Sequence, residues 1–212
     1  MSSNNLIQEQ LIAARRGQIL EAAAQVFAHK GFQRSTIKDI AQTAGIADGT
    51  IYLYFKHKDD LLLGLLDRLT QAGEQARQFE QAGETDIESW LRGYLSQQFM
   101  VMKLPQIEAF RVIIAEMLTN ETFRERAFAQ IFQPTFDAIE AQLRQWSAAG
   151  LLPAADWELV MRVHSGSVLG LITYVLIGDK RLAERWQDLP ELLTRLLLDG
   201  INGVMETEGR DG

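Results

Sequence analysis

Hydroxyl, phenol and ammonium groups are concentrated in the segment TIKDIAQTAGIADGTIYLYFKHK, which runs from Thr36 to Lys58. Such groups hydrogen-bond to phosphate oxygens and to the base edges that line a DNA groove. Thr50 and Tyr52 are placed to reach base edges or phosphates, and Gly49 allows the backbone to come close. The chemistry that these residues suit is the binding of nucleic acid.

The sequence offers little that could catalyse a reaction. It has no cysteine, which removes thiol nucleophiles and thiolate metal sites, and its three histidines (His29, His57 and His164) are far apart in the chain. It lacks a phosphate-cradling glycine loop, a serine-hydrolase elbow and a zinc-binding helix motif. We therefore expect neither an enzyme nor a bound cofactor or metal ion.

The chemistry-bearing residues are expected to lie on two short helices joined by a tight turn. Thr36 opens the first helix as its N-cap, Asp39 completes an acidic variant of the capping box, and Gly45 ends the helix in a left-handed turn. The second helix covers residues 49–55, with Asp48 as its expected cap. Because so short a helix is unstable alone, the helices beneath must hold it as the recognition helix of a helix-turn-helix.

Hydrophobic periodicity predicts helices along the rest of the chain, and no strand pattern is evident. The further helices are expected at residues 8–30, 59–82, 86–103, 105–118, 121–149, 155–177 and 189–206. Pro134 should kink or divide one of them, because proline lacks the backbone N–H. The predicted fold class is all-α, with a three-helix DNA-binding head on a larger helical ligand-binding and dimerisation bundle, about nine helices in all.

Charge and composition suggest two domains. Residues 1–60 hold seven Lys or Arg against six Asp or Glu, whereas residues 61–212 hold fourteen against twenty-two. The near-neutral first part can gather its cations on one face, towards phosphates. We expect a DNA-binding domain at 1–60 and an effector-binding and dimerisation domain at 61–212. Because the sequence shows neither a secretory signal nor an apolar run of about 18 residues, a cytoplasmic protein without a membrane span is expected.

The segment from Ile19 to Leu61 resembles the DNA-binding domain of the tetracycline-repressor (TetR) family of bacterial regulators. The resemblance rests on the patterns Gly31-Phe32, Thr36-Ile37, Ile40-Ala41-x-x-Ala44-Gly45-Ile46 and Gly49-Thr50-Ile51-Tyr52-x-Tyr54-Phe55-x-x-Lys58-x-x-Leu61. It implies phosphate contacts from Thr36, Tyr54 and Lys58, with Gly49, Thr50 and Tyr52 in the groove. It also implies a homodimer that represses transcription and leaves its double-stranded operator DNA when a small molecule binds the C-terminal domain.

Two later helices are expected to pair the protomers. Small or apolar residues recur every three or four positions in the first, at Val160, Val163, Gly166, Ser167, Gly170, Leu171 and Tyr174. In the second they are Leu189, Leu193, Leu196, Leu197, Ile201 and Val204. Two-fold pairing of such helices would set two recognition helices one DNA turn apart, about 34–36 Å. Ordinary core packing is the alternative interpretation.

The middle helices are rich in large, adaptable side chains that suit an apolar effector pocket. The residues assigned to this pocket are Trp90, Phe99, Met102, Phe110, Met117, Phe132, Phe136 and His164. An acyl or aromatic acid would fit such a lining, with its acidic end near His164 or an arginine. Each of these side chains also suits a plain core, and a structural, hydrogen-bonded His164 is the simpler alternative.

A helical module that binds proteins or small molecules, without binding DNA, is the alternative function. Such a module would keep the helical bundle, but it would not need the hydroxyl, phenol and ammonium groups exposed together between Thr50 and Lys58. DNA binding with a steep dependence on salt would separate the two functions.

Overall fold

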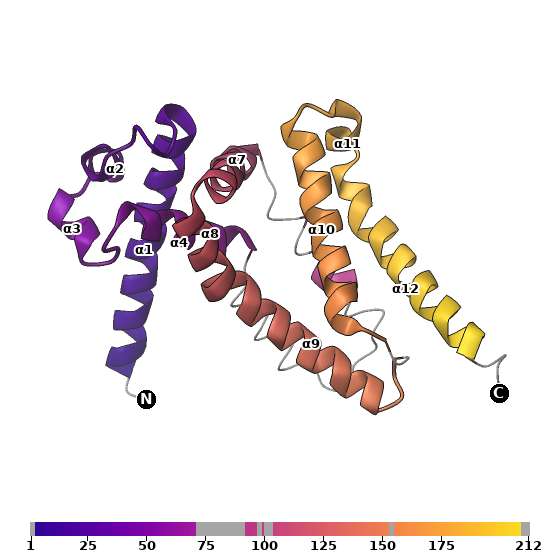
Figure 1. Ribbon diagram of the computed structural model, residues 1–212. Helices are drawn as coiled ribbons and strands as arrows, with labels where there is room; N and C mark the ends of the chain where they lie inside the picture. Colours follow the sequence, from indigo (N-terminus) through magenta and orange to yellow (C-terminus); the bar gives the residue numbers. More distant parts are fainter. Residues whose placement is uncertain (1–2, 71–91, 97–98, 100–103, 153–154, 209–212) are drawn as a thin grey trace. The chain divides into compact units, whose positions relative to one another are not determined.

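The computed structural model describes residues 3–70, 92–96, 99, 104–152 and 155–208. All regular secondary structure in these residues is helical (Figure 1), which confirms the predicted all-α class. The chain forms two compact units: Met1–Leu69 with Leu104–Ala127, and Thr70–Lys103 with Phe128–Gly212. The end of the helix expected at 59–82 and most of the one expected at 86–103 lie outside the described residues.

The first unit is built around one long helix. Its helices are α1 (Ser3–Lys30), α2 (Ile37–Ala44), α3 (Asp48–Tyr52), α4 (Lys58–Thr70), α7 (Leu104–Thr119) and α8 (Glu121–Ala127). α1 packs against both α2 and α7, and α2 packs against α3. The side chains that meet in this core are fully buried and apolar, among them Ile19, Phe27, Ile40, Ile51, Leu61, Leu66, Ile113 and Phe123.

The helix-turn-helix has the predicted helices, with one difference in length. Both reciprocal bonds of the capping box between Thr36 and Asp39 are present, and Gly45 caps α2 in the left-handed region with φ of 67°. α3 has only five residues, shorter than the seven expected. The expected cap was wrong: Ala47 holds the N-cap position, no side chain caps the helix, and Asp48 is its first helical residue.

The second unit contains the remaining helices. They are a helical segment at 92–96, the π-helical turn η1 (Phe128–Phe132), α9 (Gln133–Ala148), α10 (Trp157–Leu176), α11 (Lys180–Glu184), the 3-10 turn η2 (Trp186–Asp188) and α12 (Leu189–Glu208). Its buried cluster joins the 92–96 segment to α9 and α10 through Tyr94, Leu95, Ile139, Leu143, Trp146, Leu152, Trp157 and Met161. The short elements α11 and η2 were not predicted from the sequence.

The long helix expected at 121–149 is divided, as predicted. The π-helical turn η1 separates α8 from α9, and Pro134 follows it in the first turn of α9. The proline cannot donate to residue 130 and its ring would crowd that carbonyl, so a wider turn relieves the clash. The turn begins at Phe128, where the chain passes from the first compact unit into the second.

Candidate nucleic-acid interface and effector region

At the N-terminus of α2, the capping side chains are already hydrogen-bonded to each other. The Thr36 hydroxyl donates to Asp39 Oδ2 at 2.9 Å and accepts from the Asp39 amide at 3.1 Å, while Lys30 Nζ lies 2.7 Å from Asp39 Oδ1. The Lys30 ammonium and the Thr36 donors lower the pKa of Asp39 to about 2. Because the Thr36 hydroxyl is already engaged, a phosphate would have to compete with the cap. Its phosphate contact stays a prediction.

α3 turns one face inward and presents the other to solvent. Ile51 and Phe55 are buried beneath it, whereas the Tyr52 side chain is 55% exposed and Leu53 is 81% exposed. Gly49 is exposed, and Thr50 and Tyr54 are half-buried. The residues predicted to enter a groove are therefore accessible. Leu53 was not among them, although an apolar tip on a recognition helix suits a thymine methyl group.

Two side chains of α1 support the helix-turn-helix from below. Gln18 Nε2 donates to the carbonyl of Ala44 at the end of α2, at 2.8 Å. Arg16 Nη1 donates to the carbonyl of Tyr54 at 2.9 Å, and its guanidinium lies 4.4 Å from the centre of the Phe55 ring. Cations and donors at a helix C-terminus satisfy its free carbonyls. These contacts explain how so short a helix as α3 is held, and their long sequence separation hides them from pattern analysis.

Lys58 uses its ammonium inside the protein. Nζ donates to the carbonyls of Phe32 (2.8 Å), Ser35 (3.1 Å) and Gln33 (3.3 Å), and it lies 4.4 Å from the centre of the Phe32 ring. An ammonium has three protons, so these carbonyls account for all of them. Lys58 thus ties the turn before α2 to the start of α4. The phosphate contact that the family resemblance implies stays a prediction.

We expect Lys58→Met to lower the free energy of unfolding by about 1–3 kcal/mol, because carbonyls bonded to a charged donor lose their partner. Lys56→Met is the matched control, since Lys56 is exposed and forms no ion pair within the described part of the chain. Urea denaturation followed by circular dichroism measures the stability. If Lys58→Met leaves stability unchanged but reduces the salt slope of DNA binding by about one unit, Lys58 is a phosphate ligand instead.

The eight residues assigned to the effector pocket do not form one described cluster. Trp90 and Met102 lie outside the described residues. Phe110 and Met117 are on α7 and belong to the first unit, whereas Phe99, Phe132, Phe136 and His164 belong to the second. Within the second unit, Phe99 lies 5.0 Å from Trp186 and Phe132 lies 6.4 Å from Phe136 between ring centroids.

His164 is a buried polar residue of the second unit. Its ring centroid lies 6.0 Å from that of Tyr94, and its Nε2 finds no hydrogen-bond partner among the described residues. Trp157 Nε1, two turns earlier on α10, is also buried and has no partner in the described part of the chain. Burial lowers the pKa of His164 to about 4, so the imidazole is neutral at pH 7. The structural alternative is a hydrogen-bonded histidine, and it stays a prediction, because only Nε2 is seen without a partner among the described residues.

The protein should lose stability as the pH falls below 6.5, because of His164. Its folded-state pKa of about 4 lies below the ordinary value of 6.5, so protons bind the unfolded chain first. Between pH 6.5 and pH 5 the loss should reach about 2 kcal/mol. Urea midpoints measured across this range test it. His164→Phe should remove this dependence, whereas His57→Phe, at an exposed histidine, should keep it; equal pH dependence in all three proteins would contradict the prediction.

Three arginines could meet an acidic effector, namely Arg92, Arg111 and Arg162, and the two that belong to the second unit are already paired. Arg92 forms an ion pair with Glu191. Arg162 pairs with Glu158 at 3.2 Å and lies 5.2 Å from the centre of the Phe136 ring. An effector carboxylate would have to displace these acids. Among the described residues, no group of three His, Asp or Glu side chains is placed to hold a metal ion.

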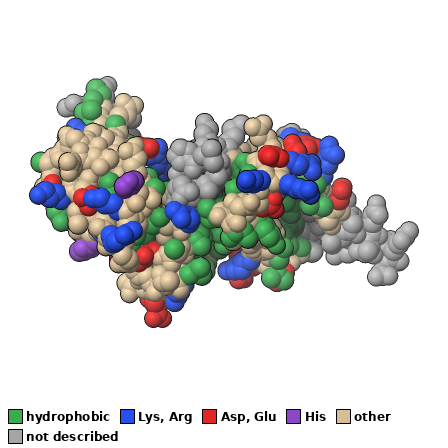
Figure 2. Space-filling view, turned by 90° about the horizontal axis from the view of Figure 1, so that it is seen from above, with side chains coloured by type: hydrophobic (Ala, Val, Ile, Leu, Met, Phe, Trp, Pro, Cys, Tyr) green, Lys and Arg blue, Asp and Glu red, His purple; other side chains and the backbone are tan. Residues whose placement is uncertain are grey.

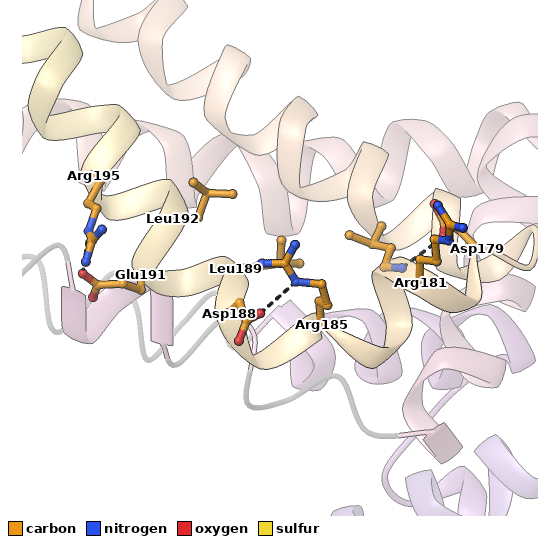
Figure 3. A pocket seen from close by; sticks show the side chains of 9 residues that line it. Asp179, Arg181, Arg185, Asp188, Leu189, Glu191, Leu192 and Arg195 are labelled. Carbon is orange, nitrogen blue, oxygen red and sulfur yellow. Dashed lines mark hydrogen bonds and ion pairs between the residues drawn. The ribbon is translucent and has the colours of Figure 1, made fainter.

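A surface pocket of about 510 Å³ lies at the α11–α12 end of the second unit (Figure 3). Its lining is Asp179, Arg181, Leu182, Arg185, Asp188, Leu189, Glu191, Leu192 and Arg195. Arg185 is paired with Asp188 at 3.0 Å, and Arg195 with Glu191 at 2.9 Å. This rim of paired charges contains none of the residues predicted to bind the effector, and it differs from the apolar lining expected.

α10 and α12 each have an outward apolar face. On α10 it comprises Leu159, Val163, Gly166, Leu169, Gly170 and Tyr174, with Ile177 at the C-cap, and on α12 it includes Leu192 and Leu196. A Cβ added at Gly166 or Gly170 would meet nothing within 4 Å. Figure 2 shows hydrophobic side chains gathered on the visible face of this unit, while Lys and Arg are scattered over the first unit.

The opposite face of these two helices lies in the core of the protomer. Val160, Leu193 and Leu197, which were expected to pair protomers, pack against the buried cluster instead. The side chains of Ile201 and Val204 lie outside the described part of the structure. The apolar spacing therefore fits both interpretations, pairing of protomers and ordinary core packing. One face of each helix packs in the core, and the other face is exposed.

Three comparisons place the chain among known proteins. Residues 19–65 match the family model for bacterial regulatory proteins of the tetR family. The fatty acid metabolism regulator protein of Bacillus subtilis is 46% identical over 70 residues, which are 33% of each chain. The chain thus matches only about a third of the length of that relative.

Two solved structures share the whole fold at low sequence identity. GusR from Salmonella enterica has a TM-score of 0.70 at 22% identity, covering 89% of this chain and 96% of its own. FadR from Bacillus subtilis in complex with stearoyl-CoA has a TM-score of 0.65 at 24% identity, covering 84% and 96%. The family model matches over α1 to α4, which are the helices that carry the candidate interface. Over its helix-turn-helix unit, this chain therefore matches the tetR family of bacterial regulatory proteins.

Proposed function

We propose that this protein is a transcriptional repressor that binds operator DNA as a homodimer and is released by a small-molecule effector. Residues 1–60 would form the DNA-binding domain and residues 61–212 the effector-binding and dimerisation domain, in a cytoplasmic protein. The observation that supports this function most is the geometry of α3. Its five residues are held by Ile51, Phe55 and Arg16, while Tyr52 and Leu53 stand exposed.

The test is selection of bound duplexes from a random library by the full-length chain. The proposed function predicts a two-fold symmetric consensus whose half-sites are about one helical turn, 10–10.5 base pairs, apart. Binding should weaken steeply with salt, because neutralised phosphates release counterions. Recovery of no consensus, together with weak binding that lacks a salt slope, would favour the alternative of a helical module that does not bind DNA.

The exposed faces of α10 and α12 support the dimer. By length and composition α10 could also cross a bilayer, since it is the one helix in the described segments that is apolar enough, with 17% of its window buried. A protein partner suits the face better than lipid does. Gly166 and Gly170 leave open space where another helix can approach closely, and Glu158 and Arg162 carry charge into the helix.

The neutral environment of His164 and Trp157 supports an uncharged or weakly polar end on the effector. Neither buried nitrogen has a partner among the described residues, and burial is the cause of the lowered pKa of His164. An acid would need a cation, and the candidates in the second unit, Arg92 and Arg162, are paired. The complex of FadR with stearoyl-CoA concerns a protein whose likeness to this chain is one of fold, so the effector class is left to experiment.

Thermal shift with matched pairs of ligands tests the effector. Long-chain alcohols and phenols should raise the melting temperature of the protein more than the corresponding carboxylic acids do. His164→Phe should reduce the difference, since its ring fills the site without a hydrogen-bonding nitrogen. Stronger stabilisation by the acids would contradict an uncharged anchor and would favour the acyl or aromatic acid.

A further inference from the structure

Glu116 is a buried carboxylate that takes no direct part in DNA binding by α2 and α3. Its side chain lies on α7 and the residue is only 5% exposed. Oε1 accepts from Gln33 Nε2 at 2.8 Å and from Asn120 Nδ2 at 2.9 Å. No Lys or Arg forms an ion pair with Glu116 within the described part of the chain. Burying a charge with only neutral donors is costly, and an apolar residue would serve stability as well or better.

The partners of Glu116 lie at functionally distinct places. Gln33 belongs to the turn between α1 and α2, immediately before the helix-turn-helix. Asn120 begins α8, where its side-chain oxygen accepts from the amide of Phe123 at 3.0 Å. One buried carboxylate thus joins the corner between α7 and α8 to the turn that precedes α2. Lys58 bonds to the same turn from α4, through the carbonyls of Phe32, Gln33 and Ser35.

A second polar contact joins α8 to the other side of the helix-turn-helix. Arg126 Nη2 lies 2.6 Å from Asp60 Oδ1, and Asp60 Oδ2 accepts from the amide of His57 at 2.9 Å. The hydrogen bonds from Arg126 and from the amide of His57 outweigh the effect of burial and lower the pKa of Asp60. α7 and α8 therefore hold both the turn before α2 and the turn after α3.

We infer that Glu116 is a positioning residue that couples the place of α7 to the orientation of the helix-turn-helix. Residues 104–127 pack with the first unit, yet both of their ends continue into the second. A change in the second unit would therefore reach the recognition helix through this segment. A hydrogen bond to one buried oxygen depends on direction, so it is either made or broken. An apolar contact would instead persist while the two helices shift past each other. This inference rests on the proposed function, because it concerns how DNA binding is regulated.

Hydrogen exchange of the full-length dimer, with and without a saturating amount of the selected duplex, tests the coupling. Binding of DNA should slow amide exchange in residues 109–127 by about fivefold or more, the low end of measured coupling between sites. Glu116→Leu should abolish this slowing at saturation with DNA. Glu116→Gln retains an acceptor oxygen and should keep part of it. Glu125→Leu, at an exposed glutamate on α8, is the control and should keep all of it.

Gln33→Met gives an independent test should Glu116→Leu fail to fold, because Gln33 is exposed and its removal breaks the same bond from the other side. Unchanged exchange in residues 109–127 of the wild-type protein, with DNA demonstrably bound, would overturn the coupling but leave the proposed function intact. Retained slowing in both Glu116→Leu and Gln33→Met would also overturn it. A wild-type protein that binds no DNA would overturn both.

Discussion

Replacing Gly170 by arginine is expected to give a folded monomer that has lost at least about 100-fold in operator affinity. A Cβ added at this position would meet no other atom within 4 Å in the described part of the protomer. Replacing a glycine inside a helix also favours the helix by up to about 1 kcal/mol, so the monomer should fold. If the partner α10 crosses here, arginine prevents its approach. A single DNA-binding domain then loses the gain in affinity of about 10²–10⁴-fold that two linked binding sites provide.

Light scattering at micromolar concentration and fluorescence anisotropy with the selected duplex measure the two effects of Gly170→Arg. Gly93→Arg is the matched control, because Gly93 also lies in a helix and a Cβ added there would likewise meet nothing within 4 Å. This variant should remain a dimer. A dimeric Gly170→Arg protein with wild-type affinity would show that the outward face of α10 serves another purpose.

Local signals in the sequence were sufficient for the first half of the helix-turn-helix. The cap at Thr36, its acidic partner Asp39 and the left-handed Gly45 lie within ten residues of one another, and each depends on contacts between near neighbours. The length of α3 was overestimated for a related reason. Arg16 bonds to the Tyr54 carbonyl just beyond the helix end from 38 residues away, and no local pattern reports such a contact.

The role of Lys58 illustrates a limit of reading residues by type. A lysine beside a recognition helix suits a phosphate, and the family resemblance implies that contact. In the structure the ammonium is surrounded by carbonyls of the turn before α2. Glu116 was overlooked for the same reason, because its significance lies in Gln33, 83 residues away. Composition shows which groups can form hydrogen bonds. Which partners they meet depends on how the helices pack, such as α7 on α1.

The effector residues were the least predictable part of the site. Large apolar side chains indicate burial, and most of the described ones are buried or half-buried. Burial does not indicate which core they join: Phe110 packs in the first unit and Phe99 in the second. The buried nitrogens of His164 and Trp157 give a sharper signal than the aromatic composition did, because an unpaired polar atom in a core is rare.

Tyr52→Ala is expected to remove sequence preference at one position of each half-site while leaving non-specific DNA binding unchanged. A base contact contributes about 1–3 kcal/mol, and a symmetric dimer makes each contact twice. The loss for the selected duplex is therefore about 2–6 kcal/mol, or roughly 30-fold to 20,000-fold. Because the Tyr52 side chain is 55% exposed, its removal should not disturb the fold. Anisotropy with the selected and a scrambled duplex measures both affinities.

Leu53→Ala separates a base contact from a general loss of DNA binding. Leu53 is 81% exposed and uncharged, so it suits a thymine methyl group and should leave the salt slope of binding unchanged. Repeating the duplex selection with this variant should relax the consensus at a thymine, whereas Leu118→Ala, at an exposed leucine on α7, should return the wild-type consensus. If the Tyr52 and Leu53 variants both return that consensus, α3 does not lie in the groove. The match of residues 19–65 to the family model would then stand, but the reading of DNA would belong to another surface of the first unit.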